Sequence, residues 1–161
     1  MPKPPLIDLS TIDLERVLYG IEDIRKVNRQ RHEMEHLTAV VHLDPSERTI
    51  VAYKDITDHE FWIRGHIPGR PLMPGVIMCE AAAQAASFLI HHCLDNPPGF
   101  VGFGGMDQVK FRGTVVPGDR FVIVGRITDL RRRRSTFESQ GFVAERMVFE
   151  GIIYGVPLDE A

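Results

Sequence analysis

The stretch "PGVIMCEAAAQAASFLIHHCL", residues 74 to 94, decides the fold of this chain. Its residues are apolar on nearly every face of a helix, and Pro74 suits a first helical turn. We therefore expect a helix that is buried on nearly every face. At 1.5 Å per residue such a helix is about 30 Å long, which is about the diameter of a small domain. The run "DNPPG" that follows ends it.

Strands are expected on both sides of this helix. "LTAVVHL" (37–43) and "RTIVAYKDI" (48–56) read as two strands separated by the turn "DPSE". Four more strand-like runs follow the helix, at about 100–112, 115–130, 133–144 and 146–155. One long helix, several later strands and no alternation of strand and helix predict an α+β fold, with a mostly antiparallel sheet wrapped around a single buried helix.

The N-terminal segment is predicted to begin with a second helix. "STIDLERVLYGIEDI" (10–24) opens with Ser10 three residues before Asp13, which is similar to a capping box, and its apolar residues follow a helical period. Residues 25–36 are polar and remain unassigned. We expect one domain over 1–161, in which residues 1–36 form a helical or irregular extension.

Composition excludes several classes of protein. The 161 residues are 43% hydrophobic and 25% charged, and the formal net charge of -3 gives no basic field for nucleic acid. Two cysteines are too few for a secreted disulfide framework. The N-terminus lacks the pattern of a signal peptide, and polar residues interrupt the run 75–94, which argues against a membrane span. These features predict a cytoplasmic protein.

A single carboxylate, Glu80, lies inside the apolar run. An unpaired buried carboxylate is costly, so such a residue is normally paired, protonated or functional. Gln84 follows at i+4 and shares its helix face, within reach of a hydrogen bond. His66 lies fourteen positions upstream of Glu80, in the Gly/Pro-rich loop "GHIPGRPLMPG".

The start of the helix offers a third chemical element. The N–H groups around Gly75 and Val76 have no intrahelical acceptor and lie at the positive end of the helix dipole. Because Gly75 has no side chain, a carbonyl oxygen that gains negative charge can approach them, as in an oxyanion hole. A base, an acid and an oxyanion donor are the groups needed to remove a proton next to a carbonyl and then expel a leaving group.

The motif "FWIRGHIPGRPLMPGVIMCEAAAQ" (61–84) resembles the signature of the FabZ-type β-hydroxyacyl-(acyl carrier protein) dehydratases. That pattern is a Gly-His-Phe-Pro loop, then Pro-Val-Met-Pro-Gly-Val, then Glu-Ala-x-Ala-Gln. The matching residues are His66, Pro68, Met73, Pro74, Gly75, Val76, Glu80, Ala81, Ala83 and Gln84. Downstream, "GGMDQVKFRGTVVPGDRFVI" (104–123) resembles a second family segment, and the likeness runs from about residue 38 to 155.

The resemblance implies a hotdog fold and the dehydration of β-hydroxyacyl-(acyl carrier protein) thioesters to trans-2-enoyl thioesters in fatty acid biosynthesis. His66 would be the base and Glu80 the protonated acid, while the Gly75 and Val76 end of the helix and Gln84 would bind and orient the substrate. No cofactor is implied, since the phosphopantetheine arm belongs to the substrate. The related FabA branch carries Asp where this chain has Glu80, which favours simple dehydration.

The family resemblance also implies partners. In that family the two catalytic residues of one site come from different subunits of a homodimer, and many members are trimers of dimers. The run "RRRR" (131–134) reads either as a solvated turn or, with Lys110 and Arg112, as a basic patch for an acidic carrier protein. His91, His92 and Cys93 have no second ligand pair at suitable spacing, so we expect no metal site.

Three alternatives remain open. "RQRHEMEHLTAVV" (29–41) departs from the family segment His-Arg-Tyr-Pro-Phe-Leu-Leu-Val-Asp-Arg, which leaves room for a dehydratase of a specialised lipid or polyketide pathway. A non-catalytic acyl-binding hotdog protein is the alternative outside enzymes. A thioesterase is disfavoured, because thioesterases of this fold lack the Met-Pro-Gly-Val helix start with Glu-Ala-x-Ala-Gln.

Overall fold

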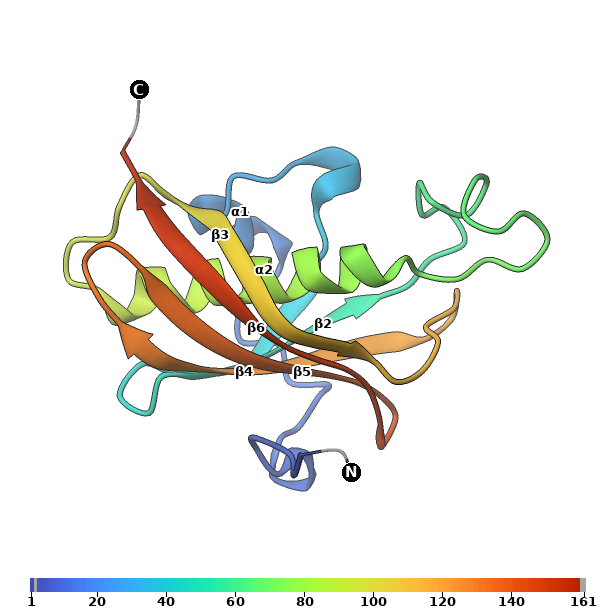
Figure 1. Cartoon of the computed structure of the whole chain (residues 1–161), viewed down its shortest axis with the longest axis horizontal. Helices are drawn as coiled ribbons and strands as arrows, with labels where there is room; N and C mark the ends of the chain where they lie inside the picture. Colours follow the sequence, from blue (N-terminus) through green and yellow to red (C-terminus); the bar gives the residue numbers. More distant parts are fainter. Residues whose placement is uncertain (2, 160–161) are drawn as a thin grey trace.

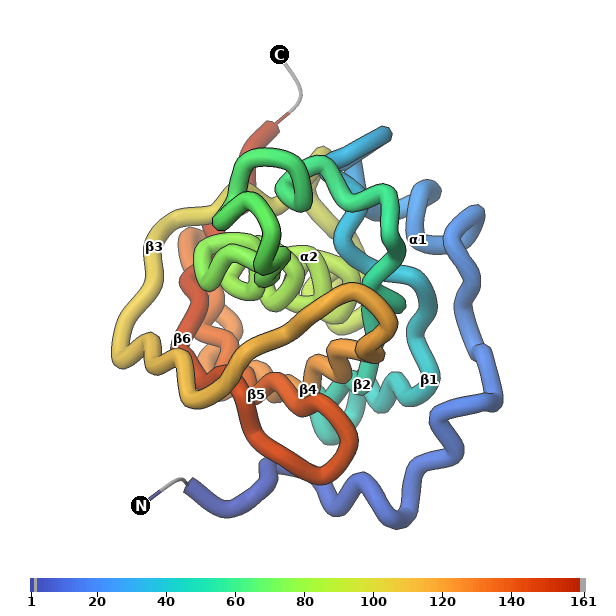
Figure 2. Tube along the Cα trace, turned by 90° about the vertical axis from the view of Figure 1, so that its right-hand side faces the viewer, coloured from blue at the N-terminus to red at the C-terminus, as the bar shows by residue number. Residues whose placement is uncertain are grey.

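One curved sheet wraps around one long helix in the computed structural model, which describes residues 1 and 3–159 (Figures 1 and 2). The elements in chain order are η1 (Leu9–Thr11), α1 (Ile21–Val27), η2 (His32–Met34), β1 (Ala39–Asp44), β2 (Thr49–Asp55), α2 (Gly75–Cys93), β3 (Phe100–Phe111), β4 (Arg120–Leu130), β5 (Ser135–Val143) and β6 (Arg146–Leu158). The predicted α+β hotdog arrangement is confirmed.

The six strands form one antiparallel sheet in the order β1-β2-β4-β5-β6-β3. The chain runs from β2 through a loop into α2, and from α2 into β3, which is the edge strand farthest from β1. Strand β4 then returns to pair with β2, so the segment on either side of the helix is tied into the same sheet. Figure 2 looks along α2 and shows the strands curving around it.

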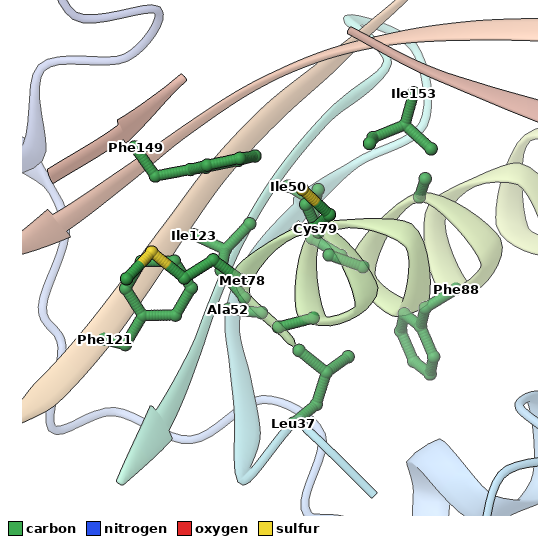
Figure 3. Packing of buried hydrophobic residues seen from close by; sticks show 14 of the residues in the cluster. Leu37, Ile50, Ala52, Met78, Cys79, Phe88, Phe121, Ile123, Phe149 and Ile153 are labelled. Carbon is green, nitrogen blue, oxygen red and sulfur yellow. The ribbon is translucent and has the colours of Figure 1, made fainter. Parts of the chain in front are cut away.

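The core lies between α2 and the concave face of the sheet. Phe88 and Leu89 of the helix are fully buried, as are Ile50 and Ile123 of the facing strands (Figure 3). Each such side chain contributes about 1.5–3 kcal/mol relative to an exposed one. The helix is therefore held by apolar contacts on nearly all its faces, as its sequence predicts. In the described part of the chain, no helix is long and apolar enough to span a membrane.

The predicted N-terminal helix over 10–24 is wrong. The α-helix α1 covers only Ile21–Val27, with Gly20 at its N-cap, and the 3-10 turn η1 covers Leu9–Thr11. The preceding residues run as a strap across the convex face of the sheet, where they cover a second apolar cluster that includes Val51, Val124 and Phe142 (Figure 2). The apolar residues of the strap thus pack on the sheet, which overrides their helical spacing.

Side chains of the sheet hold this strap in place. Gln140 accepts a hydrogen bond from the Leu6 N–H and donates one to the Pro4 carbonyl. Arg120 pairs with Asp55, reaches Glu15 in the strap, and lies over the ring of Tyr53 at 3.9 Å. The extension is therefore an integral layer of the fold.

Candidate active site

Glu80 lines a groove of about 480 Å³ on the surface of the single chain. The groove lies between α2 and the first half of β3, and β6 and the segment 29–34 complete its walls. The lining residues are Arg29, Gln30, Arg31, Met34, Glu80, Ala83, Ala86, Ser87, Phe100, Val101, Gly102, Phe103, Ile153, Tyr154 and Gly155. The lining is mostly apolar, its polar members are Arg29, Gln30, Arg31, Ser87 and Tyr154, and Glu80 supplies its one carboxyl group.

The environment of Glu80 favours its protonated form. Its side chain is half-buried among apolar residues of α2, and this burial raises the pKa of the carboxyl group. A hydrogen bond from Gln84 acts in the opposite direction and is the smaller effect. The net result is an acid that keeps its proton to higher pH than an exposed glutamate does.

Gln84 fixes the position of that carboxyl group. Its Nε2 donates to Glu80 Oε1 at 2.9 Å and to the Met34 carbonyl at 2.7 Å, while its Oε1 accepts from the His36 N–H at 2.8 Å. A carbonyl only accepts and an N–H only donates, so these two backbone partners determine which way the amide faces. Glu80 Oε1 is therefore an acceptor, and in the protonated form of the carboxyl group the proton resides on Oε2.

The segment 28–36, for which the sequence predicts no helix or strand, supports Gln84. Asn28 donates from Nδ2 to the Gln84 carbonyl at 2.9 Å. Arg31 donates to three backbone carbonyls, those of Arg25, Asn28 and Gln30, and so fixes the turn between α1 and the groove wall. Local sequence carries no signal for these contacts, because Asn28 and His36 bind a residue about fifty positions away.

His66 is held in the loop that leads from β2 to α2. Its N–H donates to the carbonyl of the buried Trp62 at 2.8 Å, and its Nδ1 lies 2.7 Å from the Leu72 carbonyl oxygen. Because that oxygen only accepts, Nδ1 carries a hydrogen, and in the neutral ring Nε2 is the nitrogen with the lone pair. The next residue, Ile67, has φ of 59°, a strained conformation for a β-branched residue. A strained loop thus holds the ring through Nδ1 and leaves Nε2 as the ring nitrogen available to a substrate.

The first turn of α2 has the geometry of an anion-stabilising site, but the ring of Phe111 occupies the space beside Gly75. Gly75 and Val76 supply N–H groups with no acceptor inside the helix, and the Val76 side chain is exposed. The space beside Gly75 is filled by the ring of Phe111, whose Cζ would lie 2.7 Å from a Cβ atom there. Packing against Phe111 is therefore one physical reason for a glycine at position 75.

The structure brings some of the predicted site residues together and keeps others apart. Glu80 and Gln84 are hydrogen-bonded, as their i, i+4 spacing predicts. Among the described residues, those that line the Glu80 groove do not include His66. The loop from 57 to 74 extends past the N-terminal end of α2 (Figure 1). One chain therefore carries the acid and the candidate base at separate places.

The helix C-terminus shows no metal site in the described part of the chain, where no three His, Cys, Asp or Glu side chains cluster suitably. His91 and His92 each use Nδ1 on a backbone carbonyl one turn earlier, those of Ser87 and Phe88. The His92 ring also packs against Phe88 at 4.4 Å. These histidines have structural contacts of their own.

The family model and the curated relatives that match this chain point to the same protein family. Residues 28–151 match the FabA-like domain. The chain is 30% identical over 133 residues to the 3-hydroxyacyl-[acyl-carrier-protein] dehydratase FabZ of Clostridium kluyveri, covering 83% of this chain and 92% of the relative. It is 33% identical over 139 residues to the FabZ dehydratase of Chlamydia trachomatis, covering 85% and 91%.

Solved structures with low sequence identity share the fold. The dehydratase heterocomplex ApeI:P from Xenorhabdus doucetiae superposes with a TM-score of 0.71 at 12% identity, covering 85% of this chain and 91% of the other. A hypothetical thioesterase with coenzyme A from Streptococcus pneumoniae gives a TM-score of 0.62 at 10% identity, covering 88% and 98%. Both the dehydratase and the thioesterase thus have this architecture, so the fold alone does not choose between the two activities.

Proposed function

Because the chain belongs to the FabA-like domain family and is a FabZ-type dehydratase, a hydro-lyase, we propose that it removes water from β-hydroxyacyl-(acyl carrier protein) thioesters in fatty acid synthesis, with His66 as base and Glu80 as acid. The observation that carries the proposal is the orientation of Glu80 by Gln84, because it leaves a carboxyl proton free to meet a leaving group in the groove. The groove has the shape and apolar character that an acyl chain needs.

The base step uses the free nitrogen of His66. Nε2 takes the proton from the α-carbon. The hydrogen bond from Nδ1–H to the Leu72 carbonyl oxygen is kept and stabilises the imidazolium that forms. The electron pair of the broken C–H bond moves toward the thioester carbonyl, whose oxygen gains negative charge. The N–H groups at the start of α2, around Gly75 and Val76, are suited to stabilise that charge.

The acid step uses Glu80. Its Oε2–H protonates the β-hydroxyl as the carbon–oxygen bond breaks, so that water leaves and the double bond forms between the α- and β-carbons. Gln84 keeps donating to Oε1, and this hydrogen bond becomes stronger as the carboxylate forms. After water leaves, the proton held by His66 returns to Glu80 and the enzyme is ready for another turnover.

We propose that the two residues meet across a homodimer. Strand β3 is an edge of the sheet and, in the described residues, pairs with β6 alone. Phe103, Met106 and Phe111 on this strand are each 44–50% exposed. Strand β3 lies beside the Glu80 groove, its outer side has no neighbouring strand among the described residues, and its side chains there are apolar. A second copy of the chain would cover such a surface. The separation of His66 from the groove within one chain supports the same assembly.

The acyl carrier protein is the partner that we propose for the substrate. Residues 131–134 form the turn between β4 and β5, and Arg134 lies 4.9 Å from the ring of Tyr154, which lines the Glu80 groove. Arg131 and Arg132 of this turn line the hollow at the C-terminal end of α2, so the run supplies a basic surface at the opposite end of the helix from Gly75 and Val76. Lys110 and Arg112 contribute less to such a patch, because both are matched to Glu150 at 4.0 and 2.7 Å.

The test is turnover of a carrier-bound β-hydroxyacyl thioester, followed by the ultraviolet absorbance of the enoyl product. Wild-type protein should form the product, and His66→Ala and Glu80→Gln should each lower kcat by at least about a hundredfold, the size of a lost acid or base. All three proteins must share one oligomeric state. Binding of acyl chains without turnover would refute the proposal and favour a non-catalytic acyl-binding protein.

A further inference from the structure

The Glu80 groove has a direction along α2. Gly75, Glu80 and Ser87 follow one another along the helix, and the groove begins at Glu80 and extends to Ser87. On the proposed function, the thioester carbonyl lies at the Gly75 end and the β-hydroxyl at Glu80. The carbons beyond the β-carbon then point along the helix toward Ser87 and the first residues of β3.

A second hollow of about 500 Å³ lies at the C-terminal end of α2. Its apolar walls include Ile90 and Leu94 of the helix, with Pro97, Pro98 and Leu130 around them, and its polar lining consists of Asn96, Arg131, Arg132, Ser135 and Asp159. Val101 lines this hollow and the Glu80 groove alike. The two spaces are therefore neighbours, and Val101 stands between them.

The partition at Val101 is tightly packed. A Cβ atom placed on Gly155 would lie 2.8 Å from Val101 Cγ1 and 3.1 Å from Ile90 Cδ1, so these two side chains meet over the backbone of β6. Only a glycine at 155 leaves room for them. Val101 and Ile90 thus both pack against Gly155, at the place where the groove and the second hollow adjoin.

The extent of the groove along α2, whose first and last lining residues on the helix are Glu80 and Ser87, sets a length. Glu80 and Ser87 are seven residues apart, which is about 10 Å along a helix. A staggered hydrocarbon chain with bonds of about 1.5 Å advances about 1.3 Å per carbon. About seven or eight carbons beyond the β-carbon therefore fit along the part of the groove that α2 lines from Glu80 to Ser87.

We propose that Val101 is the residue that limits acyl chain length, so that the protein takes short and medium chains of up to about ten or eleven carbons, as that spacing allows. The inference rests on the proposed function, because it uses Glu80 to place the β-carbon. The second hollow is the space that longer chains enter once the side chain at position 101 is reduced. Each methylene that gains burial there contributes about fourfold in kcat/KM.

The experiment compares kcat/KM for β-hydroxybutyryl, β-hydroxydecanoyl and β-hydroxypalmitoyl thioesters on the same carrier protein. We expect wild type to use the first two and to discriminate at least tenfold against palmitoyl. Val101→Ala should raise the palmitoyl value at least tenfold and leave the butyryl value unchanged. Val101→Phe should lower the decanoyl value and spare butyryl. Val109→Ala, on the same strand but away from both hollows, is the matched control and should keep the wild-type profile.

The outcomes separate this inference from the proposed function. No turnover of any chain by wild type would refute the dehydratase activity itself. Turnover of all three chains at similar rates by wild type would overturn the length limit and leave the activity standing. The same holds if Val101→Ala and Val101→Phe, both folded, show the chain-length profile of wild type.

Discussion

Replacing Gln84 by Met tests the link between the N-terminal segment and the acid. Methionine has a similar length and no amide, so the variant loses the hydrogen bonds to the His36 N–H, the Met34 carbonyl and Glu80 Oε1. At about 1 kcal/mol for each bond, with an added penalty for buried groups left unpaired, the free energy of unfolding should fall by about 4 kcal/mol. Urea denaturation measures this loss.

The same variant should change catalysis in a specific way. The bond from Gln84 lowers the pKa of Glu80, so its removal raises that pKa. Because Glu80 acts while protonated, the alkaline limb of the kcat profile should move to higher pH. The carboxyl group also loses its fixed orientation, so kcat at the optimum should fall about tenfold or more.

A control at Asn28 separates orientation from simple loosening. Asn28→Ala removes one hydrogen bond to the Gln84 carbonyl and leaves the Gln84 side chain in place. It should cost about 1–3 kcal/mol of stability and keep the wild-type pH profile. If Gln84→Met loses stability but keeps the wild-type kcat and pH profile, Gln84 only anchors the segment 34–36, and the assigned role toward Glu80 is refuted.

Two further predictions concern stability. His36 is 1% exposed, and burial, aided by the nearby Lys54, lowers the pKa of its ring to about 4 from an ordinary 6.5. The unfolded chain takes up that proton at higher pH than the folded one, so the free energy of unfolding should fall by about 3 kcal/mol between pH 6.5 and 4. His36→Phe should lack this component in denaturation curves measured across that range, and equal slopes in the two proteins would contradict the explanation. Gly125→Ala should cost about 3 kcal/mol or more, because its Cβ would lie within 1.8 Å of the Phe137 ring in the buried sheet. A thermal melt equal to wild type would exclude that packing.

The sequence predicts the central helix and the strands around it well, because buried elements have a recognisable local pattern of apolar residues. An apolar run of helical length with Pro74 before it and "DNPPG" after it permits little other than a buried helix. The strands that flank it are equally clear, although β4 begins at Arg120 and not at 115. Residues 116–119 form a turn there, with Gly118 at φ of 95°.

The N-terminal extension shows where local pattern fails. Residues 10–24 have helical spacing, yet Ile12 and Leu14 pack on the outer face of the sheet. A strap and an amphipathic helix both place apolar residues on one side. The strap forms here because the outer face of the sheet has an apolar cluster that it covers. The sequence of residues 10–24 contains no information about that cluster.

The candidate site divides in the same way. The spacing of Glu80 and Gln84 follows from helix geometry and is reproduced by their hydrogen bond. The contacts of Gln84 with Met34 and His36 join distant segments, and the position of Val101 between two hollows depends on how β3 and β6 pack against α2. Such features arise from tertiary packing, so a single sequence does not reveal them.

A subunit-mixing assay tests whether the His66 and Glu80 of one active site come from two different chains. His66→Ala and Glu80→Gln proteins, each inactive alone, are dissociated, mixed in equal amounts and reassociated before dehydration is measured. If His66 of one subunit acts with Glu80 of its partner, half of the dimers carry one intact site, and activity should recover to about a quarter of wild type. A mixture as inactive as its parents, at a confirmed exchange of subunits, would contradict an active site shared between two chains.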